Sequence, residues 1–318
     1  MSEAVRRRLG VIVNPRSRAL REGRFGLGAP PAGLEQAAPA SHEELMAALS
    51  GFASKGVDLL VVQGGDGTLR EVLTALPRAF GEHPPEIAVL ATGKTNLAAR
   101  SLGSFGPGMK ALERLRDAAE RGSLRRQRLP VLEVASPGQD ASGPLRGLLF
   151  GAGAFTDAKL LADRRLQRPG IHDGLVVALA LAGVALRTQG RGNQSLRDGV
   201  PATVAPDRMP PVWGRSFLLL ATPLDRLMLG LWPFWGEGQG PVRWLNVAAP
   251  PQRLMAALWA ATRGRPRPWM PAAGYRSGRA NRVAIHLGGP FVLDGEMFEP
   301  GPRGIELSAP GWVTFVTP

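Results

Sequence analysis

Short apolar runs alternate with amphipathic segments over the first 125 residues of the chain. The runs at 9–13, 57–62 and 87–90 consist mostly of Val, Ile and Leu, the pattern of strands that are covered on both faces, as in a parallel sheet. The segments 41–55 and 109–122 carry their apolar residues at helical spacing instead. This alternation of strand and helix predicts an open α/β sheet.

The first predicted helix, over 41–55, has a clear starting signal. Ser41 is followed three positions later by Glu44, the spacing of a capping box in which two side chains satisfy the first amides of a helix. Gly56 follows the expected end of the helix. The preceding residues 21–40 are rich in Gly, Pro and Ala, and we expect an irregular connection there.

From about residue 126 the pattern changes to short strand-like segments that are separated by Gly, Pro or polar turns. Helical patterns occur only near 155–190 and 251–263. This half is predicted to be mainly antiparallel β structure with inserted helices. The strand-like segments are VLEVA, RGLLFGAGA, SFLLLAT, VRWLNVA, RVAIHLG, PFVLDG and IELSA.

The charge balance narrows the class of partner. The chain has 39 Lys and Arg against 26 Asp and Glu, a formal net charge of +13 at pH 7. Such a surface favours anionic partners such as phosphate ligands, acidic lipid headgroups or nucleic acid. An Arg-rich and Ala-rich chain can equally reflect genomic base composition, so both explanations stay open. Because the arginines are dispersed and no nucleic-acid reader motif is present, we do not expect a nucleic-acid partner.

Several classes of site are excluded or unexpected. The chain has no cysteine, which excludes disulfides and thiolate metal sites, and its 4 histidines are too scattered for a zinc site. The longest uncharged apolar run, 174–186, is shorter than the roughly 20 residues needed to span a bilayer. The apolar run after Arg6, Arg7 and Arg8 is too short for a signal peptide. We therefore expect a cytoplasmic protein, peripheral at the inner membrane surface if its substrate is a lipid.

The stretch VVQGGDGTLREV at 61–72 carries the strongest chemical signal. Its glycines tolerate positive φ and let a ligand approach the main chain closely, so several amides can converge on an anion. A helix that begins at Thr68, with Glu71 completing a second capping box, would direct its positive end toward the same place. The stretch therefore predicts a phosphate-binding loop.

Asp66 is unexpected in a phosphate-binding loop. A carboxylate repels phosphates unless a cation lies between them or the carboxylate takes a proton from a reacting hydroxyl. A Mg²⁺-nucleotide site explains this combination. The alternative is a simple Asp-Gly turn, which is common in proteins.

Five segments together resemble the lipid-kinase family of diacylglycerol and sphingosine kinases. The GGDGT signature, which NAD kinases share, is Gly64 to Thr68, and Asn14-Pro15-Arg16-Ser17 is similar to the turn after the family's first strand. ATGKTNLAAR at 91–100 resembles the PxGTxNDxAR segment, FGAGAFTDA at 150–158 the GxxxDA segment, and Asp294-Gly295-Glu296 the late DGE motif. These segments occur in the family's order over almost the whole chain.

The resemblance implies a fold, a domain plan and a reaction. The fold class is α/β plus β, with an ATP-binding domain over 1–126, a β-sandwich domain for the lipid over 127–305, and a terminal strand over 306–318 that returns to the first domain. The active site would lie in the cleft between the domains. The reaction would transfer the γ-phosphoryl group of Mg·ATP to a lipid hydroxyl, most simply that of a diacylglycerol.

The same resemblance assigns the site residues. Asp66 would position Mg²⁺ or the incoming hydroxyl, and Glu296 would act as general base with Asp294 near it. Such a reaction depends on alignment and charge neutralisation more than on covalent catalysis. The residues expected to contact the nucleotide are Asn14, Gly64, Gly65, Gly67, Thr68, Gly93, Lys94 and Asn96.

Three positions depart from the family pattern. Arg18 replaces a glycine, Lys94 a threonine, and Leu97 an aspartate that the family keeps in the cleft, which puts the metal arrangement or activity in doubt. Gly93-Lys94-Thr95 also resembles the end of a Walker A loop, but the first glycine of that motif would fall at Ala88. Two roles for Lys94 stay open, a phosphate contact and a solvated loop residue.

The sequence therefore leads to a lipid kinase, with two alternatives. The departure at Leu97 motivates a catalytically weak relative that senses nucleotide or lipid. An NAD kinase fits less well, because that family carries an Asn-Glu pair where Asn96 is followed by Leu97. The expected partners are a lipid substrate at a membrane surface and anionic headgroups, and the sequence gives no oligomeric state.

Overall fold

The computed structural model of the protein describes residues 7–15, 34–91, 103–106, 108–136, 143–165, 197–225, 227, 232–261 and 264–318. The chain divides into two compact units, one made of Met1–Leu129 with Trp312–Pro318 and the other of Pro130–Gly311. The strands β5 (Arg125–Ala135) and β15 (Ile305–Thr317) each contribute residues to both units.

The first unit contains a parallel sheet. Its strands are β1 (Leu9–Val13), β2 (Leu34–Ala37), β3 (Leu59–Gly64) and β4 (Glu86–Ala91), in the order β4-β3-β1-β2. Leu59 pairs with Glu86 on one side and with Leu9 on the other, and all of these pairings are parallel. Phe315, near the end of β15, extends the sheet in parallel beside Ile87.

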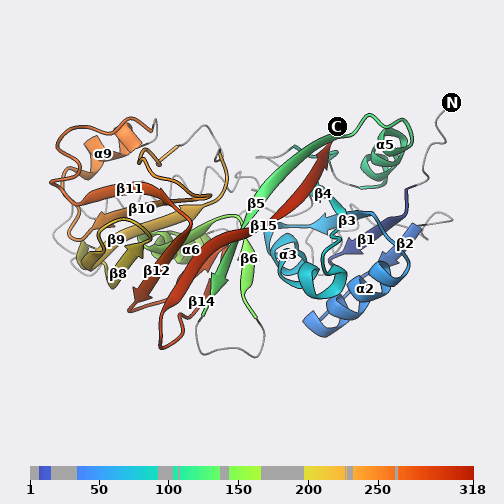
Figure 1. The fold of residues 1–318 in the computed structure, drawn as a ribbon, viewed down its shortest axis with the longest axis horizontal. Coiled ribbons are helices and arrows are strands. Elements are labelled where there is room, and N and C mark those ends of the chain that lie inside the picture. The colour runs from blue at the N-terminus through green and yellow to red at the C-terminus, as the bar shows by residue number, and fades with distance from the viewer. Residues whose placement is uncertain are drawn as a thin grey trace. The chain divides into compact units, whose positions relative to one another are not determined.

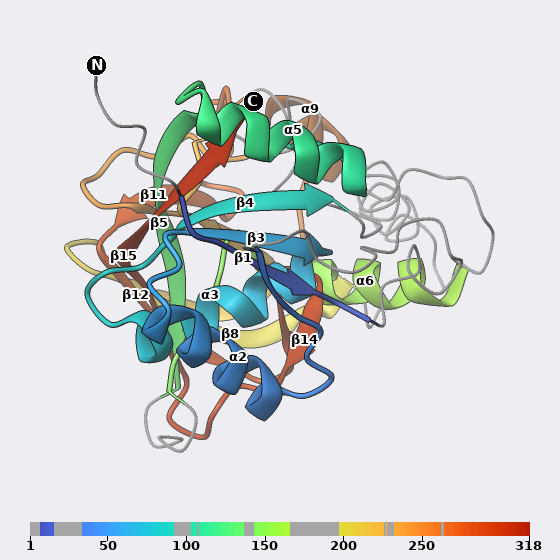
Figure 2. The same ribbon diagram turned by 90° about the vertical axis from the view of Figure 1, so that its right-hand side faces the viewer.

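Helices cover both faces of this sheet, as Figure 2 shows. Helix α5 (Met109–Glu120) lies on one face, where Leu112 and Leu115 pack with Leu59 and Val61 of β3. Helices α2 (His42–Ser54) and α3 (Asp66–Phe80) lie on the other face and contact each other. Because alternate residues of a strand face opposite sides, both faces of β3 are apolar, as its sequence predicts.

The local predictions for this unit are largely confirmed. The strand at 9–13 has the predicted bounds, and α2 begins after the N-cap Ser41, whose side chain accepts a hydrogen bond from the backbone amide of Glu44 at 3.1 Å. The strand predicted at 57–62 lies two residues later. The prediction missed β2, because its short sequence LEQA carries no apolar run and all four residues are only half-buried.

The second unit is mainly antiparallel, and strands β8 to β12 of this unit are labelled in Figure 1. Its central strand β9 (Val212–Thr222) pairs antiparallel with β7, β8 and β10, and β10 pairs in turn with β11. The remaining elements of this unit are β6 (Leu145–Gly147), β7 (Phe150–Gly153), α6 (Ala154–Arg165), β8 (Val200–Pro206), β10 (Val242–Ala248), α9 (Leu254–Ala261), β11 (Tyr275–Ala280), β12 (Arg282–Leu287), β13 (Phe291–Leu293) and β14 (Glu296–Phe298).

Two apolar clusters form the core of the second unit. One contains Trp244 with Phe150 and Phe291, whose rings stack at 5.3 Å between centroids. The other lies between α6, α9 and the strands, and includes Phe155 and Tyr275. The prediction of an α/β unit followed by an antiparallel β region with inserted helices is confirmed.

Some elements of this unit were missed, and others fall outside the described residues. The strand β8 contains Pro201 and Pro206, which weaken a strand prediction, while β11 (YRSGRA) has no apolar run and β14 has only three residues. The apolar run 174–186 lies outside the described residues. No helix in the described part of the chain is long and apolar enough to cross a bilayer.

Candidate active site

The glycine-rich loop lies between β3 and α3 in the first unit. Gly64 is the last residue of β3, Gly65 is the N-cap of α3, and the helix begins at Asp66. The prediction that this helix begins at Thr68 is wrong by two residues, so Asp66 and Gly67 belong to its first turn. The buried positions Leu69, Val72, Leu73 and Leu76 confirm the predicted apolar stripe.

None of Gly64, Gly65 and Gly67 adopts a positive φ, and Gly64 serves close packing instead. Gly65 has φ −93° and ψ −172°, an extended conformation open to other residues, and Gly67 lies within the helix. A Cβ atom added to Gly64 would lie 2.5 Å from the Cβ and hydroxyl of Thr68, closer than any real contact. The bare strand end therefore allows the first turn of α3 to sit directly against it.

Asn14 ties this turn to the neighbouring strand. Its side-chain amide donates a hydrogen bond of 2.7 Å to the hydroxyl of Thr68, and its backbone amide donates to the carbonyl of Gln63 at 3.0 Å. The expected capping box of Thr68 and Glu71 is wrong, because Thr68 is the third residue of the helix and its side chain is directed to Asn14. Asn14 therefore positions the loop.

The arrangement can bind an anion. The first amides of a helix have no acceptor within the helix, and Gly65 has no side chain to cap them. They carry the positive end of the helix dipole, the usual setting for a phosphate group. The loop also lies at the carboxyl end of β3, the edge of a parallel sheet at which ligands bind in open α/β folds.

The structure brings together one part of the predicted site. Asn14, Gly64, Gly65, Asp66, Gly67 and Thr68 lie at the junction of β1, β3 and α3. Gly93, Lys94 and Asn96, and the departures at Arg18 and Leu97, lie outside the described residues. Within the described residues, no group of three or more His, Cys, Asp or Glu side chains is arranged to hold a metal ion.

Two buried polar residues beside the loop were not predicted. Gln63 is fully buried directly before Gly64, and Arg70 is 6% exposed two residues after Thr68. The guanidinium of Arg70 lies 3.7 Å from the carboxylate of the neighbouring Glu71. The signal for Gln63 was available in the sequence, since it is the single polar residue of the run VVQGG after two valines.

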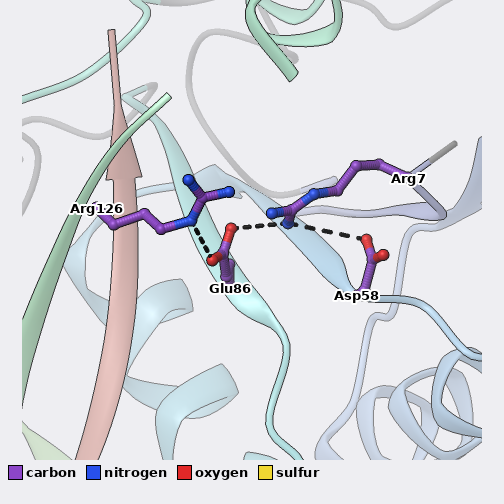
Figure 3. A network of polar contacts seen from close by, with 4 residues as sticks. All are labelled: Arg7, Asp58, Glu86 and Arg126. Carbon is purple, nitrogen blue, oxygen red and sulfur yellow. Dashed lines mark hydrogen bonds and ion pairs between the residues drawn. The ribbon is translucent and has the colours of Figure 1, made fainter. Parts of the chain in front are cut away.

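A separate charged network occupies the amino ends of β3 and β4, the opposite edge of the sheet from the loop. Arg7 lies between Asp58 and Glu86, at 4.0 Å and 2.7 Å, and Arg126 donates to Glu86 at 2.6 Å (Figure 3). Burial opposes the charge on Glu86, but the hydrogen bonds from Arg126 and Arg7 outweigh it and lower the pKa of Glu86. Burial raises the pKa of Asp58, which Arg7 only partly offsets. The network links Arg7, and Arg126 of β5, to the amino ends of β3 and β4.

In the second unit, Asp294 and Gly295 form the two-residue turn of the β13–β14 hairpin. Their φ angles are 48° and 84°, and Leu293 pairs with Glu296 across the turn. Two consecutive positive φ angles are the pattern of a type I′ turn, for which Asp-Gly is a preferred sequence. The dipeptide therefore serves as the turn of this hairpin.

The carboxylate of Asp294 is engaged by the main chain. It accepts hydrogen bonds from the backbone amides of Leu148 and Leu149 at 2.8–3.0 Å, and its own amide donates to the carbonyl of Leu149 at 2.9 Å. A Cβ on Gly147 would lie 2.5 Å from a carboxylate oxygen of Asp294, so a glycine is required there. These contacts fix the hairpin against the start of β7.

Glu296 and Asp157 are the remaining carboxylates of the predicted motifs. Glu296 is the exposed first residue of β14. Asp157 lies in the first turn of α6, where burial raises the pKa of its carboxyl group. Helix α6 contacts β7, β9 and β13, so the GxxxDA and DGE segments lie on neighbouring elements of the second unit.

Comparisons with known proteins agree with this description. Residues 8–124 match the family model of the diacylglycerol kinase catalytic domain. The chain is similar to a candidate diacylglycerol kinase from Bacillus anthracis strain Sterne, with 16% identity, a TM-score of 0.63 and coverage of 98% of this chain and 97% of that chain. A second diacylglycerol kinase structure from that strain has 15% identity, a TM-score of 0.57 and the same coverage. No curated protein matches the sequence.

The class and the family follow from these findings. The glycine loop before α3 and the matched catalytic domain support a phosphotransferase of the kinase class. Residues 8–124 match the diacylglycerol kinase catalytic domain, and the resemblance drawn from the sequence is confirmed. The similarity to the solved structures supports the fold alone, because their identities are low.

Proposed function

We propose that the protein transfers the γ-phosphoryl group of Mg·ATP to the hydroxyl group of a lipid of the diacylglycerol type. The observation that carries this proposal is the junction of β3 and α3, where GGDGT forms an uncapped helix start inside a matched diacylglycerol kinase catalytic domain. A lipid acceptor fits the family of this domain, and the net charge of +13 on the chain suits an anionic membrane surface.

The loop would hold the nucleotide phosphates through its main chain. Amides from Gly65 to Thr68 provide donors at the positive end of α3. Their directions depend on the packing of Thr68 over Gly64 and on its hydrogen bond from Asn14. Phosphoryl transfer is sensitive to alignment, so these two contacts would serve catalysis by keeping the first turn in place.

The chemistry of the loop also fits a magnesium ion. Mg²⁺ is usually held by one or two carboxylates together with substrate phosphates, and it neutralises charge that develops on the transferred group. Asp66 would supply the carboxylate, since it lies in the first turn of the helix whose amides would bind those phosphates. The same carboxylate in a loop without a cation would repel the nucleotide.

The two carboxylates of the DGE segment take different roles in this proposal. Glu296 would accept the proton of the lipid hydroxyl, since a general base needs an accessible carboxylate and Glu296 is exposed. Asp294 is instead a positioning residue, because its oxygens accept amide hydrogen bonds from Leu148 and Leu149. We retain Gly93, Lys94 and Asn96 as proposed nucleotide contacts from the sequence motif.

A panel of acceptors tests the proposal. Purified protein with Mg²⁺ and γ-labelled ATP is offered diacylglycerol, monoacylglycerol, ceramide and sphingosine in mixed micelles, and NAD in parallel. We expect label in a lipid, highest with diacylglycerol, and none in NAD. Label in NAD alone contradicts a lipid kinase. Nucleotide binding by a folded protein that transfers label to no acceptor would instead support the sensor alternative.

A further inference from the structure

Helix α9 leaves a strongly apolar face in solvent. Its sequence LMAALWAA contains no polar residue. Ala257 and Ala260 are 1% and 3% exposed and pack in one cluster with Leu245, Val247 and Tyr275 of β10 and β11, beside which α9 lies in Figure 1. Met255 and Trp259, four residues apart on another face of the helix, are 46% and 61% exposed.

This exposure is unusual for such a helix. A helix that is apolar all round is normally buried on every side, whereas a surface helix has a polar outer face. Single exposed apolar residues need no explanation, but two large ones one turn apart on a wholly apolar helix form a contiguous patch. The sequence of α9 therefore suits an environment that is itself partly apolar.

Exposed arginines flank the patch. Arg253 directly precedes α9, and its guanidinium lies 5.4 Å from the ring centre of Trp269. Arg265 and Arg267 follow the helix, and the backbone amide of Arg265 donates to the carbonyl of Ala260 at 3.1 Å. All three arginines are exposed. We call Arg253, Met255, Trp259, Arg265 and Arg267 the α9 surface.

The sequence around this surface is purely cationic. From Gly238 to Leu293 there are no Asp, Glu or Lys residues, whereas arginine stands at 243, 253, 263, 265, 267, 276, 279 and 282. The segment supplies no carboxylate of its own, and Arg243 and Arg282 pair with Asp225 and Glu306 from outside it. An apolar helix face flanked by the exposed Arg253, Arg265 and Arg267 is complementary to a surface that is anionic outside and apolar below, which describes an acidic bilayer.

We propose that the α9 surface docks the protein on an anionic lipid bilayer, with Met255 and Trp259 entering the interface and the three arginines contacting headgroups. This partner rests on the proposed function, because a diacylglycerol acceptor resides in a bilayer. Trp suits this position, since its ring is amphipathic and such rings favour the headgroup level of a bilayer. A second copy of the chain is a poorer partner, because it would bring like-charged arginines together.

Vesicle co-sedimentation tests the proposal without using the kinase reaction. Full-length protein is mixed, without ATP, with vesicles of phosphatidylcholine or of phosphatidylcholine with phosphatidylglycerol, neither of which contains an acceptor. We expect binding to the anionic vesicles that weakens as NaCl is raised, and little binding to neutral ones. Equal binding to both compositions, or no binding to either, overturns the proposal.

Variants locate the surface. Trp259→Ala should lower the partition coefficient on anionic vesicles about 10-fold, and Arg265→Gln with Arg267→Gln about 25-fold, from roughly 5-fold per arginine. Trp213→Ala is the matched control, because Trp213 is 74% exposed on β9 and should leave binding unchanged. Loss of binding in Trp213→Ala with retention in Trp259→Ala overturns the assignment to α9.

Two further measurements separate docking from catalysis and from self-association. Activity toward a short-chain diacylglycerol dispersed in detergent should be equal in wild type and Trp259→Ala, whose circular dichroism melts should also coincide. If wild type binds vesicles but phosphorylates nothing, docking stands and the kinase proposal fails. If light scattering shows that wild type is a dimer and that Trp259→Ala is a monomer, the surface is a protein interface and docking on lipid is refuted.

Discussion

The side-chain amide of Asn14 lies 2.7 Å from the hydroxyl of Thr68 and donates a hydrogen bond to it. This bond joins the end of the first strand to the first turn of α3, across 54 positions of sequence. Thr68 also sits over Gly64, where no Cβ could be accommodated. The two contacts together define where the amides of the proposed phosphate loop point.

Removing this bond should weaken both stability and nucleotide binding. Asn14→Ala and Thr68→Val each remove one partner of this hydrogen bond, so we expect each to lower the free energy of unfolding by about 1 kcal/mol. The double variant should lose less than the sum, because both changes delete the same interaction. Urea unfolding and titration with a non-hydrolysable ATP analogue measure the two effects.

Ser54→Ala is the control for that cycle. The hydroxyl of Ser54 donates to the carbonyl of Gly51 at the exposed end of α2, so its removal should change the free energy of unfolding by less than about 0.5 kcal/mol. Strictly additive losses in Asn14→Ala and Thr68→Val would show that the bond contributes nothing in solution.

Gly64→Ala should damage the loop through a steric clash. The added methyl group would lie 2.5 Å from Thr68, which must shift together with the first turn of α3. We expect kcat/KM for ATP to fall at least about 10-fold, because displacing the groups that position a substrate slows its reaction by this much or more. Gly51→Ala is matched, because nothing lies within 4 Å of a Cβ there, and should stabilise α2 by up to about 1 kcal/mol. An unaltered kcat/KM in Gly64→Ala would exclude the packing argument.

Substitutions of the two hairpin carboxylates should have different effects, Asp294 on stability and Glu296 on catalysis. Asp294→Ala leaves the amides of Leu148 and Leu149 without their acceptor, so we expect about 1–3 kcal/mol lower stability. Glu296→Gln, at an exposed position, should unfold like wild type but lose at least about 100-fold in kcat. Thermal melts and steady-state kinetics on both variants check this. A stable Asp294→Ala protein, or an active Glu296→Gln protein, contradicts the division of roles.

The network of Arg7, Glu86 and Arg126 should make stability depend on pH. The pKa of Glu86 is lowered in the folded protein, so its stabilising contribution is present above the ordinary Glu value of about 4.3 and is lost as pH falls through the lower folded value. Wild type should therefore exceed Glu86→Gln in unfolding free energy at pH 7, and the gap should close toward pH 3. Kinase activity at pH 7 should not change, because the network lies at the opposite edge of the sheet from the loop. A gap that widens as the pH falls would reverse the assigned sign.

Much of the first unit could be predicted because its signals are local. Continuous apolar runs gave β1, β3 and β4, and the capping pair Ser41 and Glu44 gave the start of α2. The glycine loop was found because its residue types are rare together. The strand β2 has no such signal, since it is short and lies half-exposed beside β1.

The errors came from interactions between distant residues. Thr68 and Glu71 have the spacing of a capping box, but the hydroxyl of Thr68 accepts a hydrogen bond from Asn14 and the helix begins two residues earlier. Asp294 belongs to a motif that suggests catalysis, whereas the amides of Leu148 and Leu149 occupy its oxygens. Neither partner can be identified from local sequence, because each lies more than 50 positions away.

The central claim is that the loop from Gly64 to Thr68, with Asp66, supports phosphoryl transfer from ATP to a lipid. The most direct measurement is the transfer of label from γ-labelled ATP to diacylglycerol micelles by wild type and by Asp66→Asn, with Mg²⁺ and equal amounts of folded protein. We predict a labelled phospholipid with wild type and at least about 100-fold slower transfer with the variant. Equal transfer by both proteins would contradict the claim.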